Sequence, residues 1–533
     1  MHTPEVELAR TDDIPPAEGT VQAIHRSRGS TASERLLADL GEHAFLDLWS
    51  YPNLFYEKKQ GGVGDGKELC DMLVVCGDDV IIFSDKHIKY QDDKPIQVAW
   101  PRFYRKAIEG AVKQINGANN WITRFPERIF TDSACTQKLP IDLPPVETRR
   151  THGVVVATGA HRAIQDALND DSGSFMIMPS LKGQEAIDFS QPGYMPFCVG
   201  DVNPGGMFIH VFDNVGIKRV LEHLNTITDF TRYLNKRAEY IRSGKLFMCH
   251  GEEELLANYL NVGIRTGGEY DFELPRKKGN EDAGMVTLQG EWSRYVLSEG
   301  YFAKTLADDI SYTWDRLITV FTENLLAGTT ETILGETATI ATAERGLRFM
   351  AAEGRFARRM LGEAVDGALR KAMEFKQDRY ARVMFPSQIN ADDKVAYVIV
   401  VVAYPVELEA RGGLKRGYVQ YRETRAKILE AYCLGVLHDN RNLNTVVAIG
   451  MDAHSSQTGR KGGSEDMLAM RIDEWTDSLI ESALKAKEHY DVLRENRIIK
   501  QKFSRDEYPA LGEPTERRWP KNRPSSKRFK KRK

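Results

Sequence analysis

The clearest pattern of apolar and polar positions lies in residues 67–90. Two short apolar runs, 72–75 and 80–83, flank the polar turn at 76–79, Cys-Gly-Asp-Asp. Short runs rich in Val and Ile and separated by Gly and Asp are typical of two antiparallel strands joined by a tight turn. We therefore predict a β-hairpin, in which Val75 pairs with Val80.

This register brings polar side chains together at the open end of the hairpin. Asp71 then lies opposite Ser84, and directly opposed side chains in a sheet are roughly 5 Å apart. Asp85 and Lys86 follow Ser84 at once. Carboxylates suit a hard divalent cation, and a nearby lysine suits a phosphate or an attacking water. A surface hairpin with solvated charges at its end accounts for the same residues.

A helix is predicted before the hairpin, starting near Ser33. Glu34 lies on the flank of its apolar stripe, and Glu42 lies farther round. A metal ion would give such an acid a partner, although an acid at a helix N-terminus is also favoured by the helix dipole. The apolar stripe has the spacing of an amphipathic helix and comprises Leu36, Leu37, Leu40, Ala44, Phe45, Leu48 and Trp49.

A second helix is predicted after the hairpin, over residues 99–122. It carries several basic residues, and Gln114 lies near its apolar face. Strand-like runs follow at 153–158, 175–180 and 207–213, after a proline-rich stretch at 139–146. They either extend the hairpin sheet or form a second one.

Helical periodicity dominates residues 216–262 and 290–385, and the last third changes character. An unbroken apolar run at 395–405 is typical of a strand buried on both faces. A helical pattern at 421–437 and a strand-like run at 445–453 complete a β-α-β unit. Ser464 is predicted to cap a following helix. Acids of the helical part are predicted to be caps and surface pairs: Asp229, Asp308, Asp309 and Asp315.

These patterns predict a mixed α/β (α+β) protein of several parts. We expect a leader at 1–30 and an α/β domain at 31–145, extending to about 215 if the later strands join it. A mainly helical region at 216–385, a second α/β unit at 390–500 and a basic tail at 501–533 follow. The helical and C-terminal regions are the expected surfaces for a protein partner or a second copy of the chain.

Composition fits a globular protein of the cytoplasm. The chain is 41% hydrophobic and 28% charged, without an apolar run long enough to span a bilayer. The first twenty residues lack the apolar core of a signal peptide. The six cysteines are scattered and form no CxxC pair, which argues against a cysteine zinc site and a disulfide framework. We expect no membrane partner.

Charge is distributed unevenly. Residues 517–533 contain ten Lys or Arg and no acid, so the rest of the chain has a net charge of −13 within the overall −3. A block of like charge with Pro and Ser attracts polyanions, and counterion release makes such binding sensitive to salt. We expect this tail to contact nucleic acid, while a solubilising end remains the alternative.

Three other chemistries lack their motifs. The glycine-rich stretch at 56–68 contains GGVGDGK, but Glu68 stands where a phosphate-binding loop needs Ser or Thr, and a strand follows instead of a helix. An ATP-driven enzyme is therefore disfavoured. The twelve histidines form no HxH or HExxH group, and no GxSxG occurs. A zinc hydrolase and a serine hydrolase are unsupported.

Residues 33–122 resemble the PD-(D/E)xK, or restriction-endonuclease-like, superfamily, closest to its nuclease-related-domain type with Gly-Glu (41–42) in the first helix. The shared pattern is a glutamate-bearing helix, an Asp on one strand, an acid-x-Lys on the next, and a helix with Gln. The corresponding residues here are Glu34 or Glu42, Asp71, Asp85 with Lys86, and Gln114. The resemblance implies a restriction-endonuclease-like core and Mg²⁺- or Mn²⁺-dependent hydrolysis of phosphodiester bonds, often in restriction and anti-phage defence.

One position departs from this pattern. Ser84 occupies the acid position of the acid-x-Lys triplet, and the acid stands at Asp85. In a regular strand Asp85 points away from Lys86, whereas a β-bulge would bring both to one face. The tail is also similar to a degenerate SEC-C zinc motif in which every cysteine is missing, so no zinc is expected there.

The sequence thus favours a metal-dependent endonuclease with DNA as the preferred substrate. Asp71, Asp85 and Glu34 would bind the metal, Lys86 would orient water, and Glu42 is the alternative helix acid. The competing hypothesis is a non-catalytic nucleic-acid-binding or regulatory protein on a degenerate nuclease fold, which Ser84 favours.

Overall fold

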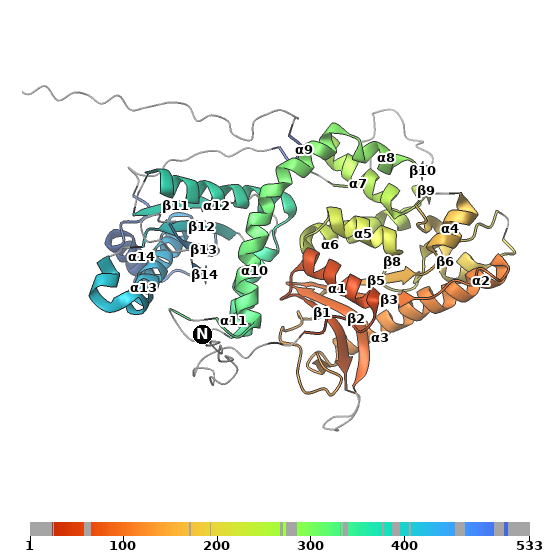
Figure 1. Ribbon diagram of the computed structural model, residues 1–533, viewed down its shortest axis with the longest axis horizontal. Coiled ribbons are helices and arrows are strands. Elements are labelled where there is room, and N and C mark those ends of the chain that lie inside the picture. Colours follow the sequence, from red (N-terminus) through yellow and green to blue (C-terminus); the bar gives the residue numbers. More distant parts are fainter. Residues whose placement is uncertain are drawn as a thin grey trace, which may run out of the picture.

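A computed structural model of the chain places the predicted hairpin inside a six-stranded mixed sheet (Figure 1). The residues that the structure describes are 24, 26–57, 66–169, 172–191, 193–266, 270–272, 285–330, 332–333, 339–375, 378–385, 395–404, 407–453, 464–494 and 506–509. The strand order is β4-β1-β2-β3-β5-β8. The predicted mixed α/β class is confirmed at this level.

The first three long strands form an antiparallel meander. They are β1 (Ser50–Tyr56), β2 (Lys67–Cys76) and β3 (Asp79–His87), and Val75 pairs with Val80 as predicted. β5 (Arg150–Thr158) and β8 (Ile209–Phe212) extend the sheet in parallel beyond β3, and the short β4 (Ile129–Phe130) closes the other edge. The central strands are buried on both faces, which explains their unbroken apolar runs.

Helices cover both faces of this sheet. α1 (Ala32–Phe45) packs so closely that a Cβ on its Gly41 would lie 2.7 Å from Met72 Sδ. On the other face α3 (Gly110–Arg124) continues α2 (Ile96–Phe103) through a π-helical turn, Tyr104–Glu109. A Cβ on Gly153 would lie 2.8 Å from Ile115 of α3. The open end of the hairpin is therefore flanked by one helix on each side.

The predicted strands after residue 150 divide between two sheets. β5 and β8 join the first sheet, whereas β6 (Met176–Lys182) and β7 (Cys198–Asp201) pair in a second, four-stranded sheet. β9 (Leu246–Cys249) and β10 (Val286–Leu288) complete it in the order β10-β9-β6-β7. The region predicted to be mainly helical thus also contributes strands.

The central part of the chain is rich in helices. They are α4 (His161–Leu168), α5 (Asn214–His223), α6 (Ile227–Arg242), α7 (Glu252–Thr266), α8 (Glu291–Val296), α9 (Glu299–Asp308), α10 (Tyr312–Leu326), α11 (Ile340–Ala351) and α12 (Arg355–Phe375). In Figure 1, α10 stands between the first sheet and the C-terminal sheet. The buried Trp49 Nε1 donates to Glu344 Oε1 of α11 at 2.7 Å. This hydrogen bond connects the first α/β domain to the central helices.

The C-terminal sheet has the predicted β-α-β unit at its centre. β12 (Val395–Val402) and β13 (Thr445–Asp452) are parallel and joined by α13 (Glu407–Asp439). β11 (Arg379–Met384) and β14 (Glu465–Arg471) flank them antiparallel, and α14 (Asp477–His489) follows. Ser464 therefore precedes a strand, and the predicted helix cap there is wrong. In the described part of the chain no helix has the length and hydropathy needed to cross a membrane.

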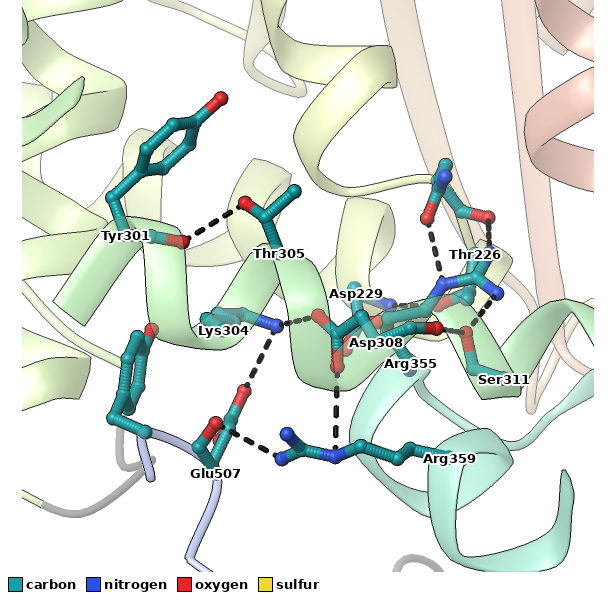
Figure 2. Close-up of polar contacts among 12 residues, drawn as sticks. Thr226, Asp229, Tyr301, Lys304, Thr305, Asp308, Ser311, Arg355, Arg359 and Glu507 are labelled. Carbon is teal, nitrogen blue, oxygen red and sulfur yellow. Dashed lines mark hydrogen bonds and ion pairs between the residues drawn. The ribbon is translucent and has the colours of Figure 1, made fainter. Parts of the chain in front are cut away.

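Buried ion pairs join the central helices, and Figure 2 draws the surroundings of one of the arginines involved, Arg355. Arg355 donates to Asp315 Oδ2 at 2.7 Å, and Arg358 donates to Asp315 Oδ1 at 2.8 Å. Both arginines are at most 5% exposed. The prediction that Asp315 forms a surface pair is therefore wrong, because this carboxylate balances two buried guanidinium groups.

One glycine at the end of β5 generates a stability prediction. Gly159 has φ +109°, and a Cβ there would lie 2.1 Å from the carbonyl oxygen of Ile88. Gly159→Ala should lower the free energy of unfolding by at least about 3 kcal/mol, because backbone cannot move aside as a side chain can.

Gly244→Ala is the matched control, since Gly244 also has a positive φ (+75°) but no atom within 4 Å of the added Cβ. It should cost only about 1–2 kcal/mol. Urea denaturation of both variants measures the difference, and equal losses would show that the contact with Ile88 relaxes freely.

Candidate functional site

Asp71 is the centre of the candidate site at the open end of the hairpin. The pairing of β2 with β3 stops at Met72 and Phe83, one residue short of Asp71. There the Asp71 carboxylate replaces the strand partner, because its Oδ2 accepts the backbone N–H of Asp85 at 2.7 Å. The same oxygen lies 3.4 Å from Lys86 Nζ. Asp71 is 4% exposed, so these two donors hold a buried carboxylate in a fixed position.

A β-bulge adds a residue to the site that the sequence did not single out. β1 pairs with β2 through Leu54–Cys70 and then Phe55–Glu68, which leaves Leu69 as the extra residue. One extra residue reverses the alternation of side chains along a strand. Glu68 is thereby placed on the same side as Asp71. A hydrogen bond shared with Asp71 is the main cause that raises the pKa of Glu68 to about 7, with burial second.

Asp85 lies on the opposite face of β3 from Lys86. The pairing of β3 with β5 runs without a register shift from Asp79–Arg150 to His87–Thr158, so the bulge that would bring the two side chains together is absent from this pairing. The Asp85 side chain lies beside Ser33 and Glu34 of the α1 end. Burial raises the pKa of Asp85 most, and Asp71 and Glu34 add to the rise.

Asp85 also has an unsatisfied atom. Its Oδ1 is buried and has no hydrogen-bond partner among the residues that the structure describes, and the residue is 8% exposed. A buried polar atom without a partner costs about 1–3 kcal/mol, and each such atom needs an explanation. A proton or a cation at this oxygen would remove the cost.

Ser84 and Gln114 interact directly. Ser84 Oγ donates to Gln114 Oε1 at 2.8 Å, and Ser84 is fully buried. This contact joins β3 to α3 behind the site. The structure thus brings Gln114 beside the Ser84–Lys86 triplet, as the resemblance implies, but its carbonyl oxygen is used by Ser84.

The two glutamates of α1 occupy different places. Glu34 closes a capping box at the start of α1, where it accepts Ser30 N at 2.7 Å and Asn53 Nδ2 at 2.8 Å. Burial acts to raise its pKa, but these hydrogen bonds outweigh it and lower the pKa. Glu34 therefore stabilises the start of its own helix, as one of its two predicted roles requires, and it also lies close to Asp85.

Glu42 is not brought to the hairpin end. It lies eight residues beyond Glu34 along the same helix, or about 12 Å at 1.5 Å per residue. A hydrogen bond shared with Asp47 raises the pKa of Glu42 to about 7. Of the two candidate helix acids, Glu34 is the one near Asp85.

The donor chemistry of the site suits a hard divalent cation. Glu68, Asp71 and Asp85 supply carboxylate oxygens, which Mg²⁺ and Mn²⁺ prefer, and Asp85 Oδ1 lacks any other partner. As the side chains stand, no group of three or more His, Cys, Asp or Glu within the described ranges is arranged to hold a metal ion. Binding would require the side chain of Glu68 or Asp85 to turn toward Asp71.

Comparisons of the chain with protein-family models, curated proteins and solved structures found no match. The site is therefore judged on its own geometry. Most of the leader, most of the glycine-rich loop and the basic tail at 517–533 lie outside the described residues, whereas Arg26 of the leader is described and pairs with Asp47 at 3.0 Å.

The raised pKa of Glu68 generates a pH prediction. The carboxyl carbon of Glu68 should titrate near pH 7 in NMR spectra, and Asp71→Asn should lower that midpoint toward the ordinary 4.5, because the neighbouring charge is removed. Between these values the folded state binds more protons than the unfolded state, so the stability from this group declines as pH rises through 7.

Asp78→Asn is the matched control, because Asp78 lies at the turn end of the same hairpin. It should leave the Glu68 midpoint near 7. A midpoint near 4.5 in the unaltered protein would show that Glu68 and Asp71 do not interact.

Proposed function

We propose that the chain is a metal-dependent nuclease whose active site is the open end of the β2–β3 hairpin. The observation that carries the proposal is the single oxygen, Asp71 Oδ2, that binds both the Asp85 backbone N–H (2.7 Å) and Lys86 Nζ (3.4 Å). An acid and a lysine from adjacent strands are thus held side by side, with Glu68 next to them.

The order of elements supports the proposal. A helix that carries Glu34, a strand with Asp71, a strand with Asp85 and Lys86, and a helix with Gln114 follow one another in the chain and pack together. This is the order that the PD-(D/E)xK resemblance implies. The helices lie on opposite faces of the sheet, so each can supply a group to the same sheet end.

In the proposed mechanism, Asp71 holds its position through the Asp85 N–H and would be the main oxygen ligand of a divalent cation. Asp85, with Glu34 behind, would complete the ligand set. When bound, such a cation polarises a phosphoryl oxygen and lowers the pKa of water. Lys86, about a quarter exposed, would orient the attacking water and offset the charge of the pentacovalent phosphate.

Glu68 suits proton transfer at neutral pH. A carboxyl group whose pKa is about 7 is both a usable base and a usable acid near pH 7. It is exposed, so water and substrate can reach it. We assign to it the role of accepting the proton of the attacking water.

A second candidate is a nucleic-acid-binding protein without catalysis. Two observations favour it: Ser84 and Gln114 bind each other in place of a ligand, and Asp85 lies on the far face of β3. Under this hypothesis the same surface binds a phosphate backbone through Lys86. The two candidates differ in whether substrate is cut.

Cleavage assays separate them. In Mg²⁺, the unaltered chain should degrade duplex DNA, with single-stranded DNA and RNA as comparison substrates. Asp71→Asn should reduce metal affinity, and Lys86→Ala should slow cleavage roughly a hundredfold or more while leaving metal binding largely intact, because one transition-state contact is lost.

Two variants serve as controls, Asp78→Asn at the turn end of the hairpin and Lys94→Ala in an exposed ion pair. Both should cut at the unaltered rate. Equal activity in all five proteins would place the chemistry elsewhere. Substrate binding without cleavage by the unaltered chain would favour the second candidate.

The basic tail is the proposed nucleic-acid contact outside the site. Deleting residues 517–533, which contain ten Lys or Arg, should weaken DNA binding and flatten its dependence on salt, because fewer counterions are released. Binding measured across a salt series gives the slope for both chains. An unchanged slope would remove the tail from the mechanism.

A further inference from the structure

A short segment near the C-terminus packs against side chains of the central helices, and the set of residues that contact it is here called the groove. Residues 506–509, Asp-Glu-Tyr-Pro, are described, although the residues on either side are not. Figure 2 shows Glu507 of this segment beside Lys304 and Asp308 of α9 and Arg359 of α12. Tyr270, in the turn after α7, completes the groove.

Glu507 is the most deeply held residue of the segment. It is 9% exposed, and its Oε1 accepts the Tyr270 hydroxyl and lies 3.5 Å from Lys304 Nζ. Burying a carboxylate is costly unless hydrogen-bond donors and an opposite charge meet it. The groove supplies both.

Arg359 donates hydrogen bonds to the backbone of the segment. Its Nη2 donates to the carbonyl oxygens of Asp506 at 3.3 Å and of Glu507 at 2.9 Å. Arg359 is 3% exposed, and its Nε lies 3.6 Å from Asp308 Oδ1. The guanidinium carries five N–H donors in a rigid fork, so one arginine can bind two successive carbonyl oxygens at once.

Tyr508 adds an aromatic contact. Its hydroxyl lies 2.6 Å from the Tyr270 hydroxyl, and Lys304 Nζ lies 5.9 Å from the centre of its ring. Lys304 therefore contacts both the carboxylate of Glu507 and the ring of Tyr508. This arrangement selects an acidic residue that is followed directly by an aromatic one.

The charges of the groove need the segment. Lys304 and Arg359 are both positive, and among the described residues Asp308 pairs with each of them. Glu507 supplies the second negative charge. An empty groove would leave a buried positive charge without its counterpart, which is unfavourable.

We propose that this groove is a binding site for a short acidic–aromatic peptide, with residues 506–509 as its resident and exchangeable occupant. The attachment to the same chain keeps the occupant at a high effective concentration. A free peptide of the same sequence binds when the resident segment is disabled. The inference is independent of the nuclease proposal.

The docked segment lies close in sequence to the basic tail. Only seven residues separate Pro509 from Arg517, where the basic stretch begins. Docking of Pro509 therefore keeps Arg517 within roughly 30 Å of the groove, the fully extended length of eight residues.

A labelled peptide with the sequence of residues 503–511 tests the proposal by fluorescence anisotropy. Full-length Glu507→Lys, in which the resident segment is disabled, should bind the peptide at least tenfold more tightly than the unaltered chain, whose groove is occupied. Lys304→Met added to Glu507→Lys should abolish binding, and a peptide with Lys in place of its Glu should not bind.

Glu481→Lys is the matched control, because Glu481 is an exposed acid on α14 far along the chain from the groove. It should behave like the unaltered chain. If Glu507→Lys does not fold, Tyr508→Ala replaces it, with the same tenfold gain expected. Equal affinity of the variant and the unaltered chain, or no binding to either variant, would overturn the proposal.

Discussion

The hydrogen bond from the Asp85 backbone to the Asp71 carboxylate is the contact on which the candidate site depends. At the last recorded pair of β2 and β3 the two strands would begin to separate, and the carboxylate bridges them at 2.7 Å. The carboxylate therefore replaces a strand hydrogen bond, and this contact fixes its orientation. Lys86 reaches the same oxygen, so the positions of the acid and the lysine are set by one atom.

Around this contact, the two neighbouring strands differ in regularity. β2 has a bulge at Leu69, whereas β3 stays in register with β5 to its end. The bulge turns Glu68 toward Asp71, and the hydrogen bond between the two carboxyl groups raises the pKa of Glu68 to about 7. The regularity of β3 keeps Asp85 on the α1 side. The acids of the site therefore come from both faces of the sheet end. Whether a metal ion binds depends on which of these side chains can turn toward Asp71.

The sequence predicted the parts of the fold that follow from local pattern. The Val75–Val80 register follows from the position of one polar turn, and the β-α-β unit from an unbroken apolar run beside a helical one. The bulge at Leu69 has no such signal, because a single extra residue leaves the apolar pattern of β2 unchanged; Glu68 was therefore missed as a site residue. Ser464 has the residues of a helix cap, but pairing of Glu465–Arg471 with β13 overrides that preference. Asp315 was misjudged because its arginine partners lie 40 and 43 residues away.

Buried charges are treated differently in the central helices and at the hairpin end. In the helices, Asp315 has both oxygens paired with Arg355 and Arg358, and Glu507 meets two donors. At the hairpin end, Asp85 Oδ1 has no such partner in the part of the chain that the structure describes. An apolar residue at position 85 would avoid this cost, so stability alone does not account for an aspartate there. Strained or unsatisfied groups that persist beside an acid and a lysine are where function is expected. Asp308 Oδ1 in the central helices also lacks a hydrogen bond, but it faces the guanidinium of Arg359 at 3.6 Å. Asp85 instead faces the acids Asp71 and Glu34, which raise its pKa, and this difference is the physical reason to look for a bound cation at Asp85.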